Sequence, residues 1–214
     1  FRPPSRHYPR VSSSENSSPK SKDDAARSAG RGGLAILAAK VFFIISGFAQ
    51  QSLLPIAIGL DGYGAMSRVF AAVNIANNVV VTSSIQGVSR AIAQSPEGRS
   101  EETLRRTFLT HIAIAAPLAL LFFLLAPLYG QFQHAPHIVT PLRVVSLVLL
   151  AYGLYAPLVG ALNGQRRFTL QAGLDVTYAT LRTVGLLVLG WLFSRQGQGP
   201  LGACLGFTLA AVVI

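Results

Sequence analysis

The sequence predicts an all-α membrane protein, a bundle of six membrane-spanning helices. Of its 214 residues 51% are hydrophobic and 12% are charged. The mean hydropathy is +0.48, which is too apolar for a soluble domain of this length. Six apolar segments follow one another, at about residues 33–58, 64–90, 107–129, 141–163, 168–193 and from 199 onward. Each approaches or exceeds the roughly 20 residues that a helix needs to cross a bilayer.

The two ends of the chain differ in character. Residues 1–32 are rich in Ser, Pro, Arg and Lys and show no apolar periodicity, so we expect a disordered basic cytosolic tail. Residues 33–214 form the predicted membrane domain. Because the last apolar segment has no polar flank, we expect the chain to be a fragment of a longer protein.

The basic residues predict the orientation of the helices. The net charge is +10, and seven of the 18 basic residues lie in residues 1–32. Four more lie in residues 90–106 and two in residues 164–168, whereas only Arg68, Arg143 and Arg195 lie near the opposite ends of the segments. Cytoplasmic loops carry the excess of Lys and Arg, which places the N-terminus in the cytoplasm. This pattern requires that the polar segment 64–90 also crosses the membrane.

Three charged residues stand out at membrane depth within the predicted spans: Lys40, Asp175 and Arg182. A charged group at membrane depth costs at least about 2.5 kcal/mol near the centre, so it needs a partner or a function. On a helix, Gln171, Asp175, Tyr178 and Arg182 project within roughly a 60° arc. They form one polar stripe along the segment 168–193.

Two interpretations of this stripe remain open. The stripe lines a hydrated substrate cavity, in which Arg182 offers a planar, permanently charged group to phosphate or another anion. Alternatively, Asp175 and Arg182 neutralise each other or fix helix packing. Lys40 either lines the cavity or extends its amine back to the cytosolic interface.

Uncharged polar residues in the first two segments suggest further cavity positions. Asn74 and Asn78 share a face of the segment 64–90 with Ser67, and Gln50 and Gln51 lie inside the segment 33–58. Such groups can bind sugar hydroxyls or form hydrogen bonds between helices. As a set they favour a cavity.

No catalytic or metal-binding motif is recognisable. Asp175 is the one acidic residue within a predicted span, so paired catalytic carboxylates are missing, and there is no phosphate-binding loop or zinc signature. His134 and His137 share a loop without further ligands. We therefore expect neither an enzyme nor a cofactor or metal. Gly202 and Gly206 form a GxxxG pattern that favours close helix packing.

Four stretches carry a family resemblance: GRGGLAILAAKVFF, LPIAIGLDGYG, GVSRAIA and LNGQRRFTLQAGLDVTYATLR. With them the membrane part resembles the polysaccharide-exporter branch, which includes O-antigen flippases, of the multidrug, oligosaccharidyl-lipid and polysaccharide flippase superfamily. The last stretch is the most specific of the four.

The resemblance implies a MATE-like fold of two six-helix lobes around a central, often cationic cavity, of which this chain supplies one lobe. It implies a multi-pass protein of the inner membrane that moves a polyprenyl-pyrophosphate-linked oligosaccharide by alternating access, without nucleic acid. A coupling cation, H⁺ or Na⁺, is a further possible partner. Two alternatives are a cation-coupled multidrug antiporter and a membrane scaffold subunit. The antiporter branch commonly has an acidic residue in its first helix, and residues 33–58 contain none.

Overall fold

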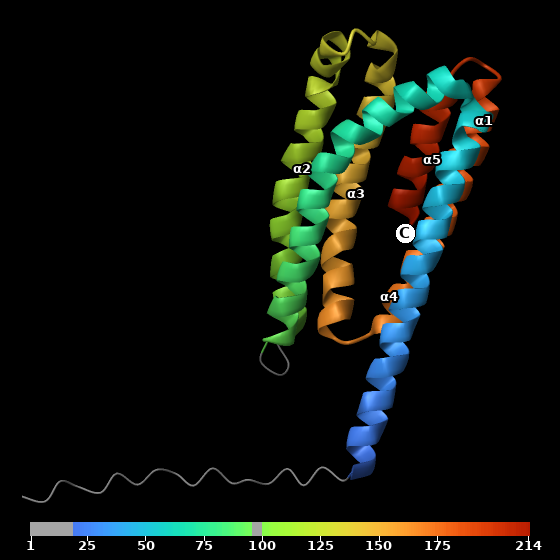
Figure 1. Ribbon diagram of the computed structural model, residues 1–214. Helices are drawn as coiled ribbons and strands as arrows, with labels where there is room; N and C mark the ends of the chain where they lie inside the picture. The colour runs from blue at the N-terminus through green and yellow to red at the C-terminus, as the bar shows by residue number, and fades with distance from the viewer. Residues whose placement is uncertain (1–18, 96–99) are drawn as a thin grey trace, which may run out of the picture.

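The computed structural model describes residues 19–95 and 100–214, which form helices joined by short turns (Figure 1). The elements are α1 (Pro19–Ala93), α2 (Ser100–Phe132), the short 3₁₀ helix η1 (Pro136–Ile138), α3 (Val139–Gly164), α4 (Phe168–Ser194) and α5 (Gly199–Val213). The predicted all-α class is therefore confirmed. The number of helices differs from the prediction, because the described residues form five α-helices in place of six.

Four stretches of the described residues are long and apolar enough to cross a membrane. They are Gly30–Ala93, Glu101–Phe132, Pro136–Gly164 and Phe168–Ser194. The apolar helix α5 has 15 residues and is shorter. The chain is therefore a multi-pass membrane protein.

The difference in helix number comes from α1, which contains both of the first two predicted segments. Its backbone departs from helical geometry at Gly59, where φ is 76° and ψ is 162°. This conformation is essentially restricted to glycine, because a Cβ atom would clash with the backbone. Figure 1 shows the first part of α1 rising to one end of the bundle and the part after the bend running back beside α2 and α3.

The start of α1 also differs from the expected tail. Helix α1 begins at Pro19, so residues 19–32 of the expected disordered tail are helical in the structure. The remainder of the predicted tail, residues 1–18, lies outside the described residues.

Two sides of the bundle are joined through α1. Helix α4 packs on α5 and on α1, while α3 packs on α2 and on α1, and α3 also contacts α5. The core of buried residues includes Val69 of α1, Val145 and Leu149 of α3, and Leu186 of α4. Large apolar side chains also cover the outer surface, such as Phe48 and Ile56, which are 75% and 81% exposed. Apolar groups on both surfaces of a helix are typical of a bundle that lipid surrounds.

Candidate functional site

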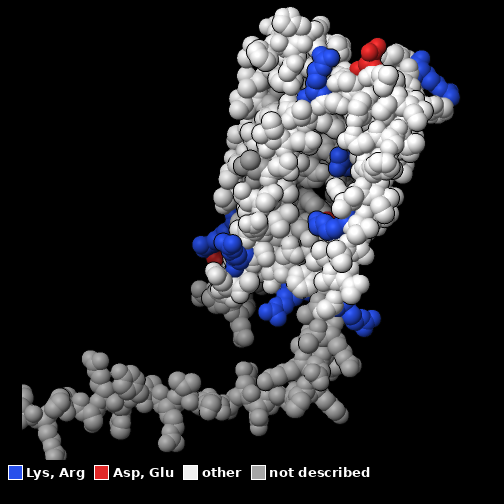
Figure 2. All heavy atoms as spheres, in the orientation of Figure 1, with Lys and Arg blue, Asp and Glu red and all other residues white. Residues whose placement is uncertain are grey.

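A polar cavity lies where the two parts of α1 face α4. Its volume is about 290 Å³. Apolar residues of α1 and α4 supply part of its wall, and six side chains with polar groups supply the rest: Gln50, Gln51, Tyr63, Ser67, Asn74 and Arg182. Figure 2 shows a hollow in the middle of the molecule with isolated basic atoms in it, away from the charged groups at the two ends. The kink at Gly59 creates this site, because it turns the second part of α1 back toward the first.

Among the described residues, Arg182 is the one charged residue that lines this cavity. Its guanidinium carbon lies 5.0 Å from the ring centroid of Phe207 and 6.0 Å from that of Phe43. Its Nε is buried and has no hydrogen-bond partner in the described part of the chain. Among the described residues, no carboxylate forms an ion pair with Arg182. The cavity therefore contains a positive charge with which no carboxylate of the described residues forms an ion pair.

Hydrogen bonds hold the amide side chains of α1 at the cavity. Gln50 donates from Nε2 to the hydroxyl oxygen of Thr183 on α4, at 2.7 Å. Thr183 in turn donates to the carbonyl oxygen of Ala179, at 2.7 Å. On the other side of Gly59, the hydroxyl of Tyr63 donates to Oε1 of Gln51. The first bond links α1 to α4, and the second links the two parts of α1 across the bend.

Asp175 forms its ion pair with Lys40 and not with Arg182. Its Oδ2 lies 3.9 Å from Nζ of Lys40, on the first part of α1. The hydroxyl of Tyr155 on α3 donates to its Oδ1 at 3.4 Å. Lys40 is the more accessible partner, with its side chain 63% exposed against 17% for Asp175. The structure therefore does not contain the ion pair between Asp175 and Arg182 that was one interpretation of the stripe.

The other predicted site residues take separate positions. The Tyr178 hydroxyl forms a hydrogen bond with that of Tyr152 on α3, inside the protein. Gln171 is buried, and its Oε1 has no hydrogen-bond partner among the described residues. Asn78 is exposed and does not line the polar cavity. Of the eight predicted positions, the structure brings together Gln50, Asn74 and Arg182 at the cavity.

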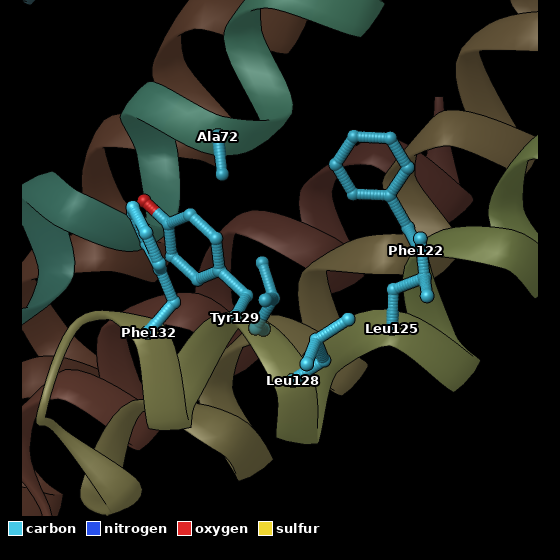
Figure 3. Close-up of a pocket in the computed structure, with 7 residues that line it drawn as sticks. Ala72, Phe122, Leu125, Leu128, Tyr129 and Phe132 are labelled. Atoms are coloured by element: carbon cyan, nitrogen blue, oxygen red, sulfur yellow. The ribbon is translucent and has the colours of Figure 1, made fainter.

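A second, larger cavity of about 580 Å³ lies between the second part of α1, α2 and α3. Its lining consists of Ala72, Phe122, Leu125, Leu128, Tyr129, Phe132 and Leu142. Figure 3 shows these side chains converging from the helices, with the Tyr129 hydroxyl as their polar group. That hydroxyl donates to the carbonyl oxygen of Arg68 at 3.3 Å. Such an apolar lining has the polarity of hydrocarbon, so it suits lipid chains better than a sugar or a phosphate.

Several residues at the polar site were not predicted from the sequence. Phe43 and Phe207 contact the guanidinium of Arg182, and Thr183 accepts the bond from Gln50. Tyr63 of α1 also lines the cavity. An aromatic or Thr residue in an apolar helix carries no signal of this kind, because only the packing of other helices decides what it contacts.

A family described as polysaccharide biosynthesis protein matches residues 58–194. The matched range covers well over half of the chain and ends with α4, so it includes Arg182, Asn74 and Asp175. This match confirms the family resemblance predicted from the sequence. A search of curated proteins and a search of solved structures found no significant match.

Proposed function

Because the chain belongs to the family of polysaccharide biosynthesis proteins, a flippase family of the multidrug, oligosaccharidyl-lipid and polysaccharide superfamily, we propose that it forms one lobe of a flippase. In this proposal the protein moves a polyprenyl-pyrophosphate-linked oligosaccharide across the inner membrane by alternating access. Members of the family are generally not enzymes. The chain's own chemistry is then binding and reorientation, without bond cleavage.

The bend at Gly59 supports a lobe of six membrane passes. The two parts of α1 run in opposite directions in Figure 1 and lie on different sides of the bundle. Counted separately, they give six passes together with α2, α3, α4 and α5. In this arrangement the segment that joins α1 to α2 and the turn between α3 and α4 face the cytoplasm. Both connections contain or adjoin basic residues, as the positive-inside rule requires.

Arg182 is the observation that carries the proposed function. An arginine within a membrane span is costly unless it is paired or used. Here no carboxylate in the described part of the chain pairs with it, and it faces a cavity with amide and hydroxyl groups. A guanidinium binds phosphate through two parallel N–H···O bonds, while Gln, Ser and Asn side chains can bind sugar hydroxyls. The cavity thus has groups for both parts of a glycosyl pyrophosphate.

Lys40 and Asp175 have a supporting role in this proposal. Their ion pair joins the first part of α1 to α4, and these two elements form one wall of the polar cavity. Because Asp175 pairs with Lys40, the charge of Arg182 stays available to a substrate. Gln171, Tyr178 and Asn78 lie outside the cavity wall, and we assign them no direct contact with substrate in this conformation.

A reconstituted flipping assay tests the function. The natural full-length protein is placed in lipid vesicles with a fluorescent disaccharide linked through pyrophosphate to a short polyprenyl chain. We expect faster movement of the probe between leaflets than in protein-free vesicles, measured as loss of the fluorescence that an impermeant quencher reaches. A matched probe without the pyrophosphate serves as the control and should move more slowly. Equal rates with and without protein would contradict the proposal.

The proposed orientation predicts a labelling pattern for engineered cysteines. The native thiol of Cys204 is fully buried and should not react. In intact spheroplasts, we expect an impermeant maleimide to label Gln131→Cys and Gln196→Cys, which lie at the predicted outer end. Gln94→Cys and Gln165→Cys should react only after the membrane is opened. All four glutamines are exposed, so accessibility on the protein is matched. Labelling of Gln94→Cys from outside would contradict six passes.

A further inference from the structure

Arg182 is surrounded by aromatic rings where a carboxylate would be the more common partner. Phe207 of α5 is the nearer ring, at 5.0 Å from the guanidinium carbon, and Phe43 of α1 is the farther, at 6.0 Å. The carboxylate of Asp175 lies on the same helix, seven residues earlier, but it pairs with Lys40. The rings therefore stabilise the charge without neutralising it.

We propose that Phe207 is a positioning residue for anion binding, which holds the guanidinium of Arg182 at the polar cavity with its N–H groups free. This inference rests on the proposed function and names the residue that prepares its binding site. The ring face carries negative electrostatic potential and attracts a cation. An aromatic ring is a weak hydrogen-bond acceptor, so the N–H groups of Arg182 stay available for the oxygen atoms of a phosphate.

The surroundings of Phe207 explain why it can fix a position. Its side chain is 3% exposed. Its ring lies 5.0 Å from that of Phe70 on α1 and 6.4 Å from that of Tyr152 on α3, measured between centroids. Contacts from two other helices therefore leave the ring little freedom. Phe43 is 37% exposed and farther away, so its contribution should be smaller.

The Nε atom of Arg182 supports the same conclusion. This atom is buried without a hydrogen-bond partner among the described residues. Leaving a buried charged donor unpaired is costly, and a phosphate bound at the other N–H groups of the guanidinium would offset this cost. The site is thus prepared for an anion, and the ring of Phe207 keeps the guanidinium in the orientation that the anion needs.

Binding of farnesyl diphosphate to the full-length protein in detergent tests the inference. We expect Phe207→Leu to weaken binding by roughly tenfold, since a desolvated cation–π contact contributes about this factor. Phe207→Tyr should keep most of the affinity. Phenylalanine with one, two or three fluorine atoms at position 207 should weaken binding progressively, because fluorine withdraws the negative charge of the ring while its shape barely changes.

Controls separate this inference from the proposed function and from misfolding. Phe123→Leu removes a ring that lies 5.2 Å from Arg143 in the same type of contact, away from the polar cavity, and should leave binding unchanged. If Arg182→Gln abolishes binding but the fluorinated series does not change it, the positioning role is wrong and the anion site stands. If Arg182→Gln binds normally, the anion site itself is wrong. Should Phe207→Leu fail to fold, the fluorinated series alone decides.

Discussion

Replacing Arg182 by alanine is expected to abolish glycan export. The substitution removes the one charge among the described residues that line the polar cavity, together with up to two charge-assisted hydrogen bonds to phosphate. Each such bond contributes about 1.5–3 kcal/mol, so the loss in binding should be at least about a hundredfold. Arg182→Lys keeps the charge but loses the planar fork, and we expect it to retain about a tenth of the activity. The measurement is surface polysaccharide in cells whose only copy of the protein is the variant.

A second arginine provides the matched control for this experiment. Arg143 on α3 also lies over a phenylalanine ring, but it is exposed and does not line the polar cavity. Arg143→Ala should therefore export normally. Each variant is first shown to be monodisperse and present in the membrane at the normal amount. Normal export by such an Arg182→Ala protein would remove the basis of the proposed function.

Replacing Gly206 by leucine is expected to prevent α4 and α5 from packing. A Cβ atom at Gly206 would clash with the backbone of Gly185 on α4 and would lie 2.8 Å from the amide nitrogen of Leu186. In the other direction, a Cβ at Gly185 would lie 2.7 Å from the carbonyl oxygen of Gly206. Because both obstacles are backbone, no side-chain rotation relieves them. We expect a loss of about 3 kcal/mol or more and little folded protein.

The same substitution at an open position isolates the packing effect. Gly173 on α4 is exposed, and a Cβ there would meet no atom within 4 Å. Gly173→Leu should therefore fold with a midpoint of thermal unfolding close to that of the original protein. Unfolding is followed by size-exclusion chromatography of heated samples in detergent. If Gly206→Leu and Gly173→Leu showed the same midpoint, the close contact between α4 and α5 would not matter for stability.

The order of the membrane segments could be read from the sequence because it depends on local properties. Apolar content over about 20 residues predicts where a helix can cross a bilayer, and the segments 107–129, 141–163 and 168–193 lie inside α2, α3 and α4. The joining of the first two segments into α1 was not predictable in this way. Gly59 permits the bend through its positive φ, but a glycine in an apolar run has many other uses.

The sequence alone determined the class of protein, its family and the types of polar group within its membrane segments. It also showed that Arg182 and Asp175 lie on one face of α4, since helical phase follows from residue spacing. Only the tertiary structure decided their partners: Lys40 for Asp175, and Phe207 for Arg182. Gln50 and Thr183, which share a hydrogen bond, are 133 residues apart. Spacing within one helix fixes the direction of a side chain, whereas its partner depends on the lateral order and axial register of other helices, which packing sets.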